Sequence, residues 1–131
     1  MEHHKLSKRS LNNLKKVHPD LVAVTELALK YSKYDFGVTQ GERSEEEQRE
    51  NIAKGVSWTM NSLHLVQPDG YVHAIDIMVY VNGKGTWDVS YYRKVIQAFV
   101  RAAIELGVQV RFGGLWRTTV DAPHIELAPY N

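Results

Sequence analysis

Apolar and polar residues in the first third of the chain repeat with the period of an α-helix. Apolar side chains recur every third position between residues 7 and 17, which predicts a short amphipathic helix there. Pro19 breaks this pattern and suits a helix start, so a second helix is expected over residues 20–32. The apolar faces of the two helices consist of Leu11, Leu14 and Val17, then of Leu21, Val24, Leu27, Ala28 and Tyr31.

A capping pattern locates a third helix. Ser44 and Glu47 have the spacing of a capping box, in which each side chain accepts a hydrogen bond from the other residue's backbone amide. Gly55 is expected to end this helix. A short strand over residues 36–40 precedes it, and an irregular loop over residues 57–61 follows it.

The pattern changes to alternation in the second half of the chain. Residues 74–81 are predicted to form a strand with two distinct faces, and residues 82–84 a turn. Residues 108–112 and 124–127 are expected to form two further short strands. A tight turn and a loop over residues 113–120 separate these two strands.

One long helix is predicted between the first two of these strands. Asp88 or Ser90 caps its start, and Gly107 closes it as a left-handed residue. Its apolar set includes Val95, Ile96, Phe99, Val100, Ala103 and Ile104. Helices followed by strands mixed with one long helix predict an α+β fold with a small antiparallel sheet. A chain of 131 residues is expected to form a single domain over residues 1–131.

Composition excludes some classes of function. The chain has 16 basic and 15 acidic residues, so its charge gives no argument for nucleic-acid binding. It contains no cysteine, which excludes disulfides and thiolate chemistry. The N-terminus lacks the apolar run of a signal peptide, and no stretch approaches the length of a membrane span. We therefore expect folding in the cytoplasm without stable membrane insertion.

Asp76 is the most informative single residue. It lies in an otherwise apolar strand, and a carboxylate on a buried strand is paired, neutralised or bound to a metal. The alternative is that Asp76 lies on an open face of the sheet. Its face also carries Met78 and Tyr80 and is therefore not clearly polar. We favour a metal ligand.

Histidines supply the other candidate ligands. His73 is three residues before Asp76, so on a continuous strand the two side chains point to opposite faces. His64 can reach Asp76 if the loop between them folds back. His124 begins the last predicted strand.

Two carboxylates near His124 compete for one role. Glu126 shares a strand face with His124, and Asp121 lies three residues before it, across a bend at Pro123. Either carboxylate can act as a proton shuttle, and either can orient a histidine ring. Spacing alone does not choose between them.

The metal motifs resemble those of a known family. Ser62-x-His64, Ala74-x-Asp76 and Asp121-x-x-His124 resemble the motifs of zinc peptidases of the VanX/VanY and D-Ala-D-Ala carboxypeptidase type. Further matches resemble, more narrowly, the phage endolysins that act as L-alanyl-D-glutamate peptidases. They are Leu11 with His18-Pro19-Asp20-Leu21, Phe36-x-Val38-x-Gln40-Gly41-x-Arg43-Ser44 with Gln48, Ala53-Lys54-Gly55, and Phe112-Gly113-Gly114-x-Trp116. The similarity covers almost the whole chain.

The resemblance implies a site. It implies one zinc ion per chain, held by His64, Asp76 and His124. It implies Asp121 as the catalytic base, Arg43 near the substrate or the developing oxyanion, Ser62 near the substrate, and Trp116 as a wall of the cleft. One departure is the interval of twelve residues between His64 and Asp76, which is longer than in the family. Residues 67–71 form the inserted loop tip, and through it Asp69 or His73 can approach the site.

The resemblance also implies a function. We expect a phage lysis enzyme that cleaves the bond between L-Ala and D-Glu in the stem peptide of bacterial peptidoglycan. The expected enzyme is a monomer that waits in the host cytoplasm until a separate protein opens the membrane toward the periplasm. The alternatives are a D,D-carboxypeptidase or dipeptidase on the same scaffold, and a non-catalytic zinc-containing module that binds wall peptide.

Overall fold

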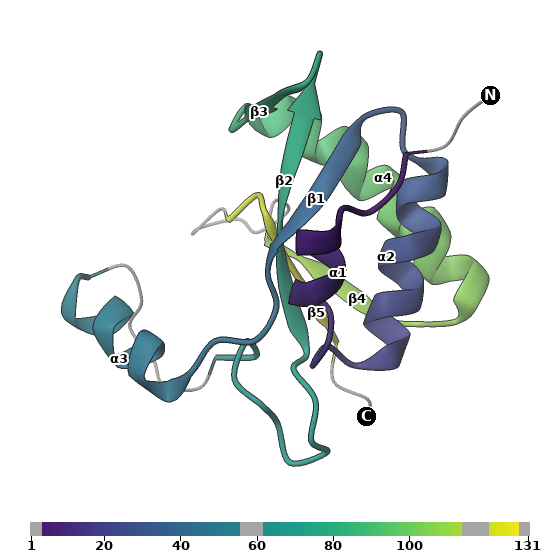
Figure 1. Cartoon of the computed structure of the whole chain (residues 1–131). Coiled ribbons are helices and arrows are strands. Elements are labelled where there is room, and N and C mark those ends of the chain that lie inside the picture. The colour runs from purple at the N-terminus through teal and green to yellow at the C-terminus, as the bar shows by residue number, and fades with distance from the viewer. Residues whose placement is uncertain (1–3, 56–61, 114–120, 129–131) are drawn as a thin grey trace.

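The computed structural model describes residues 4–55, 62–113 and 121–128, and Figure 1 shows how their helices and strands are arranged. The helices are α1 (Lys8–Asn13), α2 (Pro19–Tyr31), α3 (Glu45–Ala53) and α4 (Val89–Leu106). The strands are β1 (Asp35–Gln40), β2 (Ala74–Val81), β3 (Lys84–Thr86), β4 (Val110–Phe112) and β5 (His124–Leu127). Within these ranges, no helix has the length and apolar character needed to cross a membrane.

The strands form one sheet in the order β1–β2–β5–β4, and β3 pairs with β2 beside this path. Every ladder between these strands is antiparallel. The predicted α+β fold with a small antiparallel sheet is therefore confirmed. β3 is not among the predicted strands, because its three residues carry no alternation of apolar and polar side chains. It follows the predicted turn, where Asn82 and Gly83 both have positive φ, at 52° and 79°.

The apolar core lies between one face of the sheet and helices α2 and α4 (Figure 1). Aromatic rings join the layers, since the Phe99 ring of α4 lies 5.2 Å from Phe36 and 6.3 Å from Phe112. The sheet contributes the buried side chains Val38, Ile75, Ile77, Val79 and Ile125. Burying each such side chain stabilises the fold by about 1.5–3 kcal/mol. This face of β2 and β5 is thereby fixed as the inner one, and the alternate residues project to the opposite face.

Helix α4 is rotated relative to its predicted apolar face. Val100 and Ile104, two members of the predicted apolar set, are 37% and 75% exposed. Tyr92 and Ala102 are buried instead. The helix packs against both α2 and the sheet, so its buried stripe is wide, and sequence periodicity did not show where its edges lie.

Helix α1 covers the outer edge of β1, and its polar side chains face the strand. Ser10 Oγ accepts a hydrogen bond from the Val38 amide at 2.9 Å, and Asn13 Nδ2 donates one to the Val38 carbonyl at 2.8 Å. Leu11 consequently points outward and is 51% exposed, so its predicted place on the apolar face is wrong. The helix also ends at Asn13, before the predicted end at Val17. Its position closes a strand edge that would otherwise be open to pairing.

The predicted caps and turns are confirmed where the structure describes them. The capping box of Ser44 is formed, Asp88 is the N-cap of α4, and Gly107 is left-handed with φ 68°. The predicted loop over residues 57–61 lies outside the described residues. The same holds for residues 114–120 of the predicted turn and loop.

Candidate metal centre

Asp76 and His124 come together because they are direct partners across the β2–β5 ladder. His124 Nδ1 lies 3.3 Å from Asp76 Oδ1. The Asp76 side chain is 23% exposed. Its carboxylate is therefore partnered and mostly buried, and the alternative of an open, solvated sheet face is wrong.

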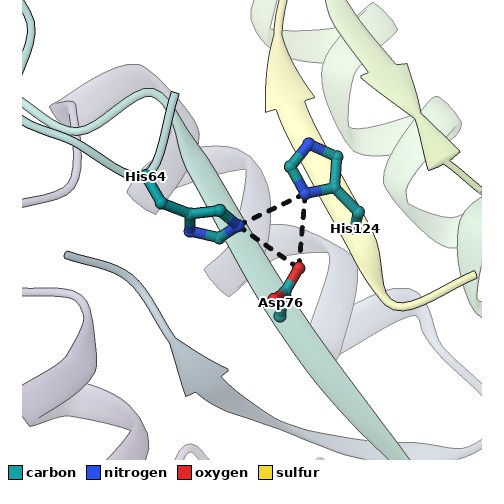
Figure 2. Close-up of side chains that lie close together, drawn as sticks. All are labelled: His64, Asp76 and His124. Carbon is teal, nitrogen blue, oxygen red and sulfur yellow. Dashed lines mark hydrogen bonds and ion pairs between the residues drawn. The ribbon is translucent and has the colours of Figure 1, made fainter. Parts of the chain in front are cut away.

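His64 completes the group from the loop that precedes β2, as Figure 2 shows. Its Nε2 lies 3.4 Å from Asp76 Oδ1 and 3.3 Å from His124 Nδ1. The three residues each offer one ligand atom, and these atoms all lie within 4.8 Å of one another. We call His64, Asp76 and His124 the inner cluster. Two imidazole nitrogens and one carboxylate oxygen are a donor set that could hold a metal ion.

The loop folds back toward Asp76, as the sequence required for His64 to reach it. The amide of Arg43 donates to the His64 carbonyl at 2.8 Å, and the amide of His73 donates to the Leu63 carbonyl at 2.9 Å. These two hydrogen bonds hold the chain on both sides of the ring. His64 itself is 2% exposed.

The far nitrogen of each histidine has its own acceptor. His64 Nδ1 donates to the Gly41 carbonyl at 2.9 Å, and His124 Nε2 donates to Glu126 Oε1 at 2.8 Å. A carbonyl or carboxylate oxygen only accepts, so these nitrogens carry the protons. His64 Nε2 and His124 Nδ1 are then the atoms that turn toward the common centre, which is the arrangement that orients metal-binding histidines.

Gly41 has a steric reason to be glycine. A Cβ atom at this position would lie 2.0 Å from the Asn13 carbonyl oxygen of α1. The close approach of these two backbones sets the position of the Gly41 carbonyl, which receives the His64 proton. Helix α1 thus contributes to the site through the backbone of the chain.

The charges of the inner cluster depend on one another. Burial by itself would raise the pKa of Asp76, but hydrogen bonds from His124 and His64 more than offset it and hold this pKa well below its usual range. Burial would lower the pKa of His124, but Asp76 and Glu126 raise it to about 9. At neutral pH, His124 is therefore protonated in the metal-free protein, and a metal ion must displace that proton.

Asp121 lies beside the inner cluster on the segment before β5. Its amide donates to the Gly113 carbonyl at 3.0 Å, and its own carbonyl accepts from the His124 amide at 3.1 Å. A Cβ atom on Gly113 would lie 2.1 Å from the Asp121 carbonyl oxygen, so glycine permits this contact. Partial desolvation and the Asp76 carboxylate raise the pKa of Asp121. A carboxyl group with a raised pKa next to a metal site suits proton transfer.

Arg43 approaches the inner cluster from the turn before α3. Its Nη2 lies 4.0 Å from Asp76 Oδ2, and its side chain is 14% exposed. Nη1 donates to Gln48 Oε1 and Nη2 to Gln40 Oε1, each at 2.7 Å. These two glutamine contacts were not predicted from the sequence, although Gln40, Arg43 and Gln48 all belong to the motif that resembles the family.

Glu126 is engaged on both sides. One carboxylate oxygen accepts from His124, and the other pairs with Arg111, its cross-strand partner on β4. Burial would raise the pKa of Glu126, but His124 and Arg111 hold it below its usual value. Its geometry favours the orienting role that the sequence had left open. The pairing with Arg111 was missed, because the two residues are distant in the sequence and adjacent only across the sheet.

The substrate-binding roles of Ser62 and Trp116 stay predictions. Ser62 Oγ accepts a hydrogen bond from the His64 amide at 3.2 Å, so it stabilises the turn that carries the ligand. Its predicted contact with substrate stays a prediction. Trp116 lies outside the described residues.

A second group of two histidines and one aspartate forms around the inserted loop. His73 Nε2 lies 2.7 Å from Asp69 Oδ2, and His18 Nε2 lies 3.9 Å from the same oxygen. We call His18, Asp69 and His73 the outer cluster. His73 and Asp69 bind each other and take no part in the inner cluster. β2 begins at Ala74, so the argument from opposite faces of a continuous strand is not tested for His73, but its place outside the inner cluster agrees with the expectation that it does not share an ion with Asp76.

The fold and the inner cluster together define a class, namely a small α+β protein in which two strand residues and one loop residue form a group that could hold a metal ion. The family model described as phage L-alanyl-D-glutamate peptidase matches residues 2–128. The chain belongs to this family, which confirms the resemblance seen in its motifs.

Individual relatives agree with this assignment. The L-alanyl-D-glutamate peptidase of Escherichia phage T5 is 37% identical over 139 residues, which cover 94% of this chain and 97% of the phage protein. The protein of the same name from Listeria phage A118 is 34% identical and covers 90% of this chain but 40% of its own length. The crystal structure of the Serratia marcescens L-Ala D-Glu endopeptidase ChiX matches with a TM-score of 0.87 at 41% identity, over 95% of this chain and 91% of that one.

Proposed function

We propose that this protein is a zinc-dependent endopeptidase that hydrolyses the bond between L-Ala and D-Glu in the stem peptide of bacterial peptidoglycan. The observation that carries the proposal is the convergence of the inner cluster, in a chain whose relatives bear the name of this activity. Two imidazoles and one carboxylate favour zinc over magnesium or calcium, which prefer oxygen ligands.

His64 Nε2, His124 Nδ1 and Asp76 would hold one zinc ion per chain. When bound, the ion supplies Lewis acidity, which lowers the pKa of a water molecule and polarises the scissile carbonyl. Gly41 and Glu126 accept from the far nitrogen of each ring, so the near nitrogen of His64, and that of His124 once its second proton is displaced, would face the ion. The protein's own contribution is therefore a pair of rings that are already oriented before the metal binds.

Four further residues act on the substrate in this proposal. Asp121 accepts the proton of the attacking water and passes it to the leaving amine, which its raised pKa supports. Arg43 offsets the negative charge that develops on the carbonyl oxygen. Ser62 contacts the substrate, as does Trp116 in the cleft wall.

The test is a digest of purified peptidoglycan with zinc-loaded protein, analysed by mass spectrometry. We expect fragments that end in L-Ala and complementary fragments that begin with D-Glu, and we expect a chelator to abolish both. Release of free D-Ala or a D-Ala dipeptide would instead identify a carboxypeptidase or dipeptidase. Binding to wall material without any fragments would identify a non-catalytic module.

The proposal extends to where the protein works. Residues 1–131 act as one peptidase domain and as a monomer, in the host cytoplasm until a separate protein opens the membrane and admits the enzyme to the periplasm. The names of the phage relatives support a role in lysis. Fractionation of infected cells before and after membrane opening tests this part, since wall fragments should appear only afterwards.

A further inference from the structure

The guanidinium group of Arg43 is held by two neutral side chains. Gln48 Oε1 accepts from Nη1 and Gln40 Oε1 accepts from Nη2, while the Asp76 carboxylate lies farther away, at 4.0 Å from Nη2. We propose that Gln40 and Gln48 are positioning residues, which orient Arg43 toward the reacting carbonyl without neutralising its charge. This inference rests on the role of Arg43 in the proposed function.

The burial of Gln48 is the first reason. Among the nine residues of α3, all of which the structure describes, Gln48 is the one buried side chain, and it is 0% exposed. The remaining residues of this helix are exposed or half-buried and mostly charged. Burying an amide is unfavourable unless it is hydrogen-bonded. The contact with Arg43 therefore explains why a polar helix turns a polar residue inward.

The chemistry of the two acceptors is the second reason. An amide oxygen fixes the direction of an N–H group but carries no net charge. A carboxylate in the same place would form a charge-assisted pair and cancel the field that Arg43 offers to a developing oxyanion. Arg43 Nε is buried and has no hydrogen-bond partner among the described residues, so the two glutamine contacts at Nη1 and Nη2 are the hydrogen bonds that orient the guanidinium there.

The location of the two glutamines is the third reason. Gln40 ends β1 and is the cross-strand partner of Asp76, and Gln48 lies one turn into α3. They therefore approach the guanidinium from two different elements. Two such contacts restrict its rotation more than either one alone, which is what a preorganised oxyanion partner requires.

The decisive variant is Gln48→Glu, which preserves the shape and the hydrogen bond but adds a negative charge. We expect normal zinc content, a melting temperature at or above that of the wild type, and a fall in kcat of at least about tenfold with little change in KM on a soluble L-Ala-D-Glu peptide. Gln48→Met removes the acceptor and should also lower kcat. If Gln48→Glu does not fold, Gln40→Glu carries the same expectation.

Binding of a charged analogue supplies a readout other than turnover. A phosphinate analogue of L-Ala-D-Glu bears the negative charge that the substrate acquires only in the transition state. In the zinc-loaded protein, Gln48→Glu should weaken its binding by about the same factor as it lowers kcat. If Gln48 had a merely structural role, the affinity for the phosphinate would be the same in Gln48→Glu as in the wild-type protein.

The matched control is Gln97→Glu, which places the same substitution on the exposed face of α4. It should leave kcat, KM and phosphinate binding at wild-type values. Wild-type kcat in Gln48→Glu, or loss of zinc together with activity, would overturn the inference. Failure of the proposed function is a different result, because the wild-type protein itself would then release no L-Ala–D-Glu fragments.

Discussion

The inner and outer clusters contain the same residue types, two histidines and one aspartate, yet they are built differently. In the inner cluster three ligand atoms lie within 4.8 Å of one another. In the outer cluster Asp69 lies between the histidines, at 2.7 Å from His73 and 3.9 Å from His18, and the two rings meet edge to face. Residue types alone therefore do not identify a metal site.

The far nitrogens explain the difference. In the inner cluster the far nitrogens of His64 and His124 donate to oxygen acceptors, so in each neutral ring the near nitrogen carries the lone pair, which His124 gains once it loses its second proton. In the outer cluster His18 Nδ1 accepts from the Asp20 amide at 3.0 Å, so in the neutral ring the proton sits on Nε2, the atom nearer Asp69. The hydrogen-bond partner of one ring nitrogen thus decides which nitrogen of a neutral histidine is free to act as a ligand.

Removing one histidine ring at a time from each cluster is the strongest test of whether the inner cluster, and not the outer one, binds zinc. His64→Ala and His124→Ala should reduce zinc from about one per chain to nearly none and abolish wall lysis, because each removes a ligand. His73→Ala should preserve both. Elemental analysis and initial lysis rates of the purified variants check this. If His73→Ala loses zinc while His64→Ala keeps it, the ligands belong to the other cluster.

A substitution at Asp121, beside the inner cluster, tests proton transfer separately from metal binding. Asp121→Asn keeps the size of the side chain but removes the proton acceptor. We expect normal zinc content and folding, and a rate lower by roughly two to four orders of magnitude. The measurement is zinc content together with initial rate. An active Asp121→Asn protein would exclude Asp121 as the base.

The residue that orients His124 should have a smaller effect. Glu126→Gln can still accept from His124 Nε2 but loses the charge, so we expect a loss of about 10- to 100-fold in zinc affinity or activity. Zinc titration against a competing chelator measures it, with Asp121→Asn as the reference. An inactive Glu126→Gln protein with full zinc, beside an active Asp121→Asn, would reverse the two roles.

The charge of His124 makes metal binding depend on pH. Its pKa is raised to about 9, so zinc must displace a proton at lower pH, and the apparent affinity should fall by about tenfold per pH unit below that value. The folding stability of the metal-free protein depends on pH in the opposite direction to the zinc affinity. Protonated His124 stabilises the fold fully below its ordinary pKa of 6.5, and this stability is lost as pH rises through about 9. Chelator competition and thermal melts between pH 6 and pH 10 test both trends.

The outer cluster should give the smallest effect. Asp69→Asn removes an exposed, charged hydrogen-bond partner of His73. We expect a small decrease in melting temperature and unchanged zinc content and lysis rate, because exposed ion pairs contribute little. A marked loss of activity in this variant would show that the inserted loop acts on the site.

Local signals were sufficient for most of the fold. The capping box of Ser44, the proline that begins α2, the left-handed Gly107 and the alternation in β2 each act within a few residues, and each prediction is confirmed. The inner cluster was also predicted, because motif resemblance linked His64 and His124 to the unusual Asp76.

Contacts that depend on the packing of distant elements were not predictable. Arg111 meets Glu126 only through the β4–β5 register, and Gln48 meets Arg43 only through the position of α3. The sequence around Gly41 does not show that its backbone contacts Asn13. In the same way, the exposed Ile104 satisfies the helical period but lies beyond the edge of the packed stripe.

The position of β5 has a consequence for how the protein is made. It comes last among the strands, yet it lies between β2 and β4, and it brings in a histidine 60 residues away from its partner His64. Contacts between residues so far apart in the sequence are slow to form. The ion-binding geometry is then completed only after the sheet has closed around β5. If zinc binds at the inner cluster as proposed, its uptake during refolding should report the pairing of β5 with β2.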